Sequence, residues 1–135
     1  HLGPFVDDAT SWERMRTQLA TIAETGRIIR IGPAEAPIGI AAFHVTHDNP
    51  LWVDTWQTAR ATAELEVIVV DPDARGQGVG TRLLDSVDAI LAADGVHDQC
   101  VAAFAPNLAA IELYRRRGFR PAWLTLVGFR QPRGA

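Results

Sequence analysis

Lysine is absent from the sequence, cysteine occurs once, and there is no long apolar stretch. All thirteen basic residues are arginine, and sixteen acidic residues leave a formal net charge of −3. This balance disfavours a general nucleic-acid-binding protein, which normally carries a basic face. The single Cys100 cannot form a disulfide within the chain, as is typical of proteins in a reducing cytoplasm. No apolar run approaches the roughly 18 residues that cross a bilayer, so we expect no membrane partner.

The length and composition favour one globular domain. The chain has 135 residues, of which 47% are apolar and 21% are charged. Two domains of half this length would each lack a sufficient hydrophobic core. We therefore predict a single domain over residues 1–135.

Hydrophobic spacing and turn residues predict an alternation of helices and strands. The segment 47–60 is polar and mixed, and we expect a loop there. The order of the other elements describes an α/β domain, or α+β in some schemes, with a mixed sheet. We expect helices at 10–24, 79–93 and 107–117, and strands at 27–31, 38–46, 61–70, 96–104 and, once or twice, within 119–129.

A glycine-rich segment, Arg75-Gly76-Gln77-Gly78-Val79-Gly80, lies between a predicted buried strand and a predicted helix. A helix N-terminus has free backbone N–H groups and roughly half a positive charge, and glycines let an anion approach the backbone. The segment is therefore either a phosphate-binding loop or an ordinary tight turn. Its spacing does not fit the dinucleotide-binding fingerprint, and no Lys-Ser/Thr pair follows as in a Walker loop.

Two motifs resemble those of the GNAT acetyltransferase superfamily. Residues 70–80 look like the coenzyme-binding signature, which is Gln or Arg, two residues, Gly, one residue, then Gly or Ala. One strand later, residues 107–119 (Asn-Leu-Ala-Ala-Ile-Glu-Leu-Tyr-Arg-Arg-Arg-Gly-Phe) resemble the second motif of the family at every defining position. The resemblance covers residues 27–129. Before it the family usually has a strand and two helices, whereas this sequence predicts one helix, so we expect the N-terminal region to be incomplete.

The resemblance implies a GNAT fold, with a central mixed, mostly antiparallel sheet flanked by helices and a splayed strand pair that holds the coenzyme. It implies acetyl-CoA as co-substrate, no metal, and direct acetyl transfer to a primary amine of a small molecule or peptide. Asn107 has the alternative role of a helix cap. The residues expected to contact the coenzyme are Ile68, Val69, Val70, Arg75, Gly76, Gln77, Gly78, Val79, Gly80, Thr81, Asn107 and Tyr114.

Three side chains are candidates for the proton chemistry of such a transfer. An alkylamine has a pKa of about 10 and must lose a proton before it attacks. Glu64 and Glu66 are two residues apart on a predicted strand and so face the same side. We expect one of them, with a slight preference for Glu64, to be the general base; the alternative is a carboxylate that faces solvent or pairs with an arginine. Tyr114 is expected to protonate the departing thiolate, and is otherwise a core aromatic.

Other residues of reactive type are expected to play no part in the chemistry. Cys100 lies in an apolar segment and is expected to be a core residue rather than a nucleophile. His44, His47 and His97 have no ligand-like spacing, so we expect no metal site. Residues 115–117, all arginine, are expected to form a solvated helix face, from which one side chain could reach a coenzyme phosphate.

The loop predicted before the base strand carries Trp52 and Trp56 with Asp48 and Asp54. Aromatic and acidic side chains together suit a cationic amine, but the tryptophans could equally pack under the loop or form the contact of a homodimer.

Two alternatives to the function of an enzyme also stay open. One is a non-catalytic acyl-CoA-binding or regulatory module, and the other is a toxin that acetylates aminoacyl-tRNA, which the acidic balance disfavours.

Overall fold

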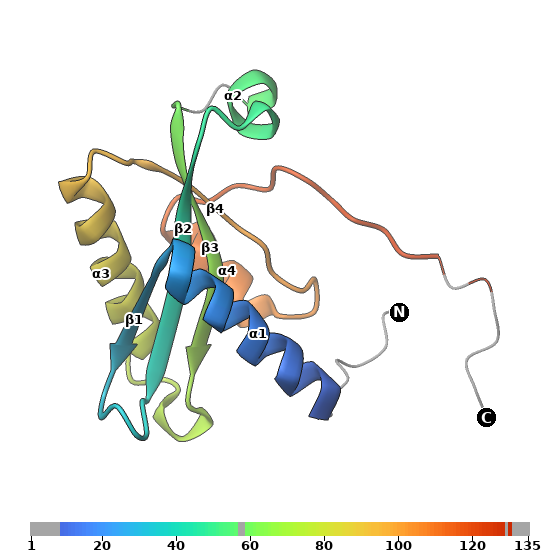
Figure 1. Cartoon of the computed structure of the whole chain (residues 1–135). Coiled ribbons are helices and arrows are strands. Elements are labelled where there is room, and N and C mark those ends of the chain that lie inside the picture. Colours follow the sequence, from blue (N-terminus) through green and yellow to red (C-terminus); the bar gives the residue numbers. More distant parts are fainter. Residues whose placement is uncertain (1–8, 57–58, 129, 131–135) are drawn as a thin grey trace.

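A four-stranded mixed sheet with the strand order β1-β2-β3-β4 forms the centre of the molecule (Figure 1). The first three strands are antiparallel neighbours, and β4 runs parallel to β3. The sheet is therefore mixed and mostly antiparallel, as predicted. The computed structural model describes residues 9–56, 59–128 and 130, and the strands are β1 (Arg27–Ile31), β2 (Gly39–His47), β3 (Ala61–Val70) and β4 (Asp98–Val101).

Helices cover both faces of this sheet. Helix α3 (Val79–Ala93) packs on one face, and α1 (Ala9–Thr25) crosses β1 and β2 on the other. Helix α2 (Pro50–Trp56) connects β2 to β3, the short 3-10 helix η1 (Pro72–Ala74) precedes α3, and α4 (Leu108–Arg116) follows β4. None of the helices in the described ranges combines the length and apolar character needed to cross a bilayer.

The hydrophobic core lies between α3 and the sheet. The inner side of α3 presents leucines and valines at helical spacing, and small residues on the strands let the helix approach closely. Gly39 of β2 is such a position, because a Cβ there would lie 2.7 Å from Val79 Cγ1. The buried residues that form this core include Ala41, Phe43, Ala63, Leu65, Leu83, Leu84, Val87 and Leu91.

The pairing of strand β3 with both of its neighbouring strands changes at one point. Its pairing with β4 ends at Leu65, opposite Val101. On the other side, Phe43 pairs with Leu65 and Ala42 pairs with Val67, so Glu66 is the extra residue of a β-bulge. Within the described structure, β3 continues to Val70 without a neighbour on its β4 side. The two parallel strands therefore separate, as the predicted splayed pair requires.

Most of the predicted elements are confirmed. The strands at 27–31 and 61–70 and the helix at 79–93 have the predicted bounds, and α1, β2 and α4 differ from prediction by one residue at each end. The strand expected at 96–104 is shorter and covers only Asp98–Val101.

The prediction of a loop over residues 47–60 is wrong, because this segment contains α2. Asn49 caps the start of this helix, since its Oδ1 accepts a hydrogen bond from the Leu51 amide at 3.1 Å and its carbonyl accepts one from the Val53 amide at 2.9 Å. Pro50 follows at the first helical position, where its missing N–H costs nothing. The Asn-Pro pair was a helix-start signal, but seven residues are too few to show helical periodicity.

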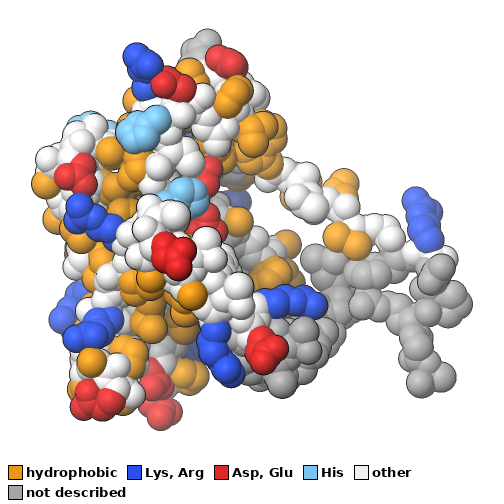
Figure 2. Space-filling view, in the orientation of Figure 1, with side chains coloured by type: hydrophobic (Ala, Val, Ile, Leu, Met, Phe, Trp, Pro, Cys, Tyr) orange, Lys and Arg blue, Asp and Glu red, His pale blue; other side chains and the backbone are white. Residues whose placement is uncertain are grey.

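The prediction of one or two strands within residues 119–129 is also wrong. Residues 119–128 contain no strand, and Phe129 lies outside the described residues. Phe119 still packs against Tyr114 and the core, but beyond it the chain runs away from the sheet, and the large apolar side chains of residues 123–127 are exposed (Figures 1 and 2). Among these, Trp123 makes edge-to-face contacts with Trp52 and Trp56 at ring distances of 6.0 and 5.4 Å. The composition favoured a strand, but no neighbouring backbone pairs with it here.

Replacing Leu83 with alanine should lower the free energy of unfolding by about 2–5 kcal/mol, because the fully buried side chain leaves a cavity between α3 and the sheet. Leu126→Ala removes the same atoms from a side chain that is 82% exposed, and should change stability by less than about 0.5 kcal/mol. Urea denaturation of both variants measures the difference. Equal losses would contradict this location of the core.

Candidate active site

The glycine-rich segment forms an open turn between η1 and α3. Gly76 and Gly78 have φ angles of +76° and +77°, which residues with a side chain rarely adopt. Apart from the glycine itself and the residues next to it in sequence, no atom of the described chain lies within 4 Å of the position that a Cβ would take at either residue. The turn is anchored from behind, since the Asp71 amide donates to the Ile38 carbonyl at 2.8 Å and the Asp71 carboxylate accepts from the Asp73 amide at 2.9 Å.

Backbone N–H groups of this turn remain available to a ligand. The first hydrogen bond of α3 runs from the Arg82 amide to the Gly78 carbonyl at 3.0 Å. In the described part of the chain, the backbone amides of residues 76–81 donate to no acceptor, and the Gln77 side chain donates from Nε2 to the Asp73 carbonyl at 3.4 Å. Free amides, an open surface and a helix N-terminus are the features that accommodate a phosphate. The residues thus fit the diphosphate of a coenzyme, and we call residues 75–81 the cradle.

Strand β3 leads directly from its separation from β4 into this cradle. Ile68 and Val70 pack toward α3, while Val69 is exposed. The backbone edge of these three residues that would face β4 is unpaired in the described structure. An extended amide-containing ligand could hydrogen-bond to this edge as an added strand does. The predicted strand and cradle contacts therefore form one continuous surface along the chain.

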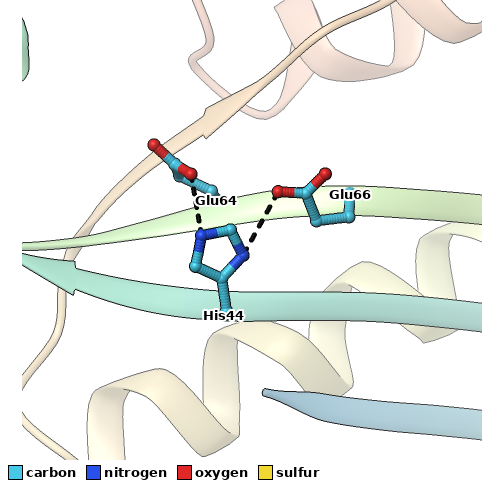
Figure 3. A group of neighbouring side chains, drawn as sticks. All are labelled: His44, Glu64 and Glu66. Atoms are coloured by element: carbon cyan, nitrogen blue, oxygen red, sulfur yellow. Dashed lines mark ion pairs between the residues drawn. The ribbon is translucent and has the colours of Figure 1, made fainter. Parts of the chain in front are cut away.

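The two predicted base residues lie together on the face of the sheet opposite α3. Figure 3 shows His44 of β2 between Glu64 and Glu66 of β3. The His44 Nε2 atom lies 2.9 Å from Glu64 Oε2, and its Nδ1 atom lies 3.2 Å from Glu66 Oε1. The three side chains are between 25% and 30% exposed. Glu64 and Glu66 thus share a histidine, rather than pairing with an arginine. We call these three residues the triad.

Each carboxylate of the triad has a second, separate donor. Gln18 of α1 donates from Nε2 to Glu66 Oε2 at 3.3 Å. Trp52 of α2 donates from its indole Nε1 to Glu64 Oε1 at 3.2 Å. The two carboxylates therefore have different surroundings, although they are only two residues apart.

A cavity of about 380 Å³ opens beside the triad, between α1 and the sheet. Its lining combines hydroxyl, amide, imidazole and carboxylate groups with one isoleucine. Glu66 contributes to this lining, whereas Glu64 does not. The lining residues are Gln18, Thr21, Ile22, Thr25, His44 and Glu66.

Helix α4 carries the other two predicted site residues. Asn107 caps it, since its Oδ1 accepts a hydrogen bond from the Ala110 amide at 3.3 Å. Tyr114 packs against Phe119 with a ring distance of 5.7 Å, and its burial raises the pKa of the phenol. The preceding Leu113 reaches within 3.4 Å of the position of a Cβ on Gly80. These contacts place α4 beside the first turn of α3.

Two charged side chains considered for ligand contacts are engaged within the protein. Asp48 forms a two-point ion pair with Arg60 at 2.7 and 2.9 Å, and this hydrogen bonding lowers the pKa of the Asp48 carboxyl. Arg117 pairs with Asp85 and Asp88 of α3 at 2.9 and 2.6 Å and is only 19% exposed. The prediction that residues 115–117 form a solvated face is therefore wrong for Arg117.

Sequence reasoning missed His44 and Gln18 as members of the site, whereas Trp52 was among the residues considered for contact with an amine. The separation of 20 positions between His44 and Glu64 hides the contact, which arises because the two residues face each other in the antiparallel pair β2–β3. The triad also offers three metal-ligand atoms within 4.8 Å of one another. Sequence spacing did not indicate this group, and the expectation that the protein needs no metal stays a prediction.

The chain matches the model of the acetyltransferase (GNAT) family over residues 5–119. It therefore belongs to this family, and the resemblance of its two motifs is confirmed. The mycothiol acetyltransferase of Clavibacter michiganensis subsp. michiganensis is 31% identical over 134 residues, which cover 86% of this chain and 40% of that protein. An uncharacterised N-acetyltransferase of Methanocaldococcus jannaschii is 36% identical over 96 residues, covering 67% and 40%. The chain thus spans about two fifths of the length of these relatives.

Solved structures share the fold at low sequence identity. The aminoglycoside N-acetyltransferase AAC(6')-Iy in complex with CoA superimposes with a TM-score of 0.66 at 19% identity, covering 92% of this chain and 93% of that chain. A putative acetyl transferase from Pyrococcus furiosus gives a TM-score of 0.67 at 18% identity, covering 94% and 83%. These matches confirm the predicted fold class.

Cys100 of β4 lies opposite Glu64 of β3 in the parallel pair. Burial, and then the negative charges of Glu64 and Glu66, raise the pKa of the Cys100 thiol to about 12. The thiol therefore stays protonated at neutral pH, which supports its assignment as a structural residue rather than a nucleophile.

Alkylation of Cys100 by iodoacetamide should be slow in the folded protein and should accelerate on unfolding. At pH 9 the thiolate fraction in the folded chain is about a thousandfold smaller than in the unfolded chain, because the folded pKa is about 12. Mass spectrometry of samples with and without urea measures both rates at this only cysteine. In the folded protein the rate should still rise between pH 9 and 10. Equal rates in the two states at pH 9 would rule out the raised pKa.

Proposed function

We propose that this domain transfers the acetyl group of acetyl-CoA to a primary amine of a small polar molecule. The observation that supports this most directly is the position of Glu66. It lies at the bulge where β3 separates from β4, and it also lines the cavity beside α1. A carboxylate there would face an acceptor on one side of the strand, while the unpaired edge of β3 faces the coenzyme.

The coenzyme would be held mainly by the backbone. The amides of residues 76–81 supply donors for the diphosphate, and the edge of residues 68–70 supplies hydrogen bonds for the pantetheine. Main-chain contacts suit this task, because the glycine φ angles fix the turn before the ligand arrives. Arg75, Gln77 and Thr81 have exposed side chains that can add contacts to the phosphates.

The acceptor would bind in the cavity. Its volume suits a molecule the size of a sugar, and its hydroxyl, amide and carboxylate groups suit a cationic ligand with several polar groups. The names of the relatives, mycothiol acetyltransferase and aminoglycoside N-acetyltransferase, also point to small-molecule acceptors. Together these features favour a small amine over a peptide.

The proton chemistry would use groups on both sides of the separated strands. A carboxylate of the triad removes a proton from the ammonium group, which frees the nitrogen lone pair to attack the thioester. A backbone amide near Ile68 would stabilise the negative charge that develops on the thioester oxygen. Tyr114 would protonate the departing thiolate, and its raised pKa keeps the phenol protonated until then.

The purified domain should release thiol from acetyl-CoA with at least one small polar amine among amino sugars, polyamines and short peptides, with a mass gain of one acetyl group on the acceptor.

Gly78→Val should raise the KM for acetyl-CoA about tenfold or more, because a β-branched residue is strained at this φ and intrudes on the cradle.

Gly95→Val is the matched control for this variant. Gly95 has a φ of +74° and equally open surroundings, but lies just beyond the other end of α3. The Gly95→Val variant should lose about as much stability as Gly78→Val, but its KM for acetyl-CoA should not change. Equal effects of both substitutions would argue against the cradle, and coenzyme binding without transfer to any amine would favour the non-catalytic alternative.

Tyr114→Phe should lower kcat about a hundredfold while changing the KM for acetyl-CoA less than threefold, because it removes an acid and keeps the packing of the ring. Steady-state kinetics and a thermal melt measure both effects. Phe119→Leu, which alters the ring partner of Tyr114 but removes no proton donor, is the control. An unchanged kcat in Tyr114→Phe would exclude the phenol from the reaction.

A further inference from the structure

The triad contains a surplus of hydrogen-bond acceptors. A neutral imidazole carries one N–H, yet both ring nitrogens of His44 lie within hydrogen-bond distance of a carboxylate oxygen. With a neutral ring, one of the two contacts can use this N–H, and the other contact needs a further proton carried by a carboxyl. The arrangement therefore offers a route for a proton from one carboxylate to the other.

The two ends of the triad are not equivalent. Glu66 lines the cavity and occupies the bulge. Glu64 does not line the cavity. It accepts a hydrogen bond from the Trp52 indole at 3.2 Å, and its Oε2 atom lies 2.9 Å from His44 Nε2, the shorter of the two triad distances. The shorter distance favours the His44 tautomer that carries its proton on Nε2, facing Glu64.

We infer that Glu66 is the base that contacts the amine, and that His44 is a positioning residue that relays the proton from Glu66 to Glu64. This inference rests on the proposed transferase function and goes beyond it, because it separates the roles of the two carboxylates. It also gives a role to a histidine that the sequence motifs do not include.

Every proton in the relay is accounted for. The surplus proton first leaves the triad for solvent, so that Glu66 is ionised and His44 carries one proton on Nε2. The N–H bond of the ammonium breaks and an O–H bond forms on Glu66. That O–H bond then breaks as an N–H bond forms on Nδ1, while the Nε2–H bond breaks and an O–H bond forms on Glu64. The partly exposed ring loses the Nδ1 proton to water and takes one from water on Nε2 before the next turnover. Glu64 is partly exposed and releases the proton to water.

The groups around His44 leave few other routes for this proton. Of the described residues that face the ring, Glu64 and Glu66 of β3 are carboxylates, and the Cys100 thiol of β4, opposite Glu64, has a pKa raised to about 12. From α1, the cavity lining contributes an amide and hydroxyl groups. Among the described side chains around the ring, the two carboxylates are therefore the groups that can exchange a proton with it.

Substitutions of His44 distinguish a role in proton transfer from a purely structural role. His44→Gln keeps a hydrogen-bonding side chain but cannot carry a proton from one end to the other. We expect kcat to fall at least about tenfold, with the KM for acetyl-CoA within twofold of wild type and an altered pH profile of kcat/KM. In His44→Ala, added imidazole should restore part of the lost kcat. The control is His47→Gln, which replaces an exposed histidine at the end of the same strand and should behave as wild type.

Two further measurements keep this inference distinct from the proposed function. In wild type, ¹⁵N NMR of the histidine rings should show the neutral His44 ring with its proton on Nε2, whether or not an acceptor is known. A proton on Nδ1 would overturn the relay independently of activity. Wild-type kcat and pH profile in a folded His44→Gln enzyme would overturn it even if the transferase function holds. Absence of transfer by wild type toward every amine would instead contradict the proposed function.

Discussion

The separation of β3 from β4 after Leu65 is the constraint on which the rest of the site depends. At this point β3 loses one neighbour, and the bulge at Glu66 shifts its register with the other. The loss opens a backbone edge that extends to the cradle. The bulge lets Ile68 and Val70 continue the core on the α3 side, while Glu64 and Glu66 both reach His44 on the opposite face. One local irregularity thus serves packing, ligand access and the placement of the carboxylates.

Burial and charge around this separation set the protonation of each group. Burial keeps the Tyr114 phenol protonated, and burial together with the two carboxylates does the same for the Cys100 thiol. The triad is different, because its side chains are partly exposed and both ring nitrogens of His44 lie within 3.2 Å of a carboxylate oxygen. The proposed acyl transfer would draw its proton donor from α4 and its proton acceptor from the α1 side of the sheet.

Local signals in the sequence were sufficient for most of the fold. The apolar run of β3, the helical spacing of α3 and the glycines between them predicted three consecutive elements with correct bounds. These local signals failed where an element or a side chain depends on a residue far away in the sequence. The apolar residues 123–127 favoured a strand, but strand formation needs a neighbouring backbone that composition does not reveal. His44 lies beside the two glutamates because β2 pairs with β3, and the spacing of the histidines in the sequence does not indicate this contact. The glycine positions were predicted because a family motif specifies them in sequence, and the two glutamates because residues two apart on a strand face the same side.

Amide NMR of the ¹⁵N-labelled protein during addition of coenzyme A tests the central claim most directly. If the coenzyme lies along the open edge of β3 with its diphosphate at the start of α3, the amide signals of residues 66–70 and 76–81 should shift most, with the glycines at 76, 78 and 80 prominent among them. The amides of β1 should shift little. Shifts centred on another surface, or saturable binding that leaves the amides of 76–81 unchanged, would contradict this account.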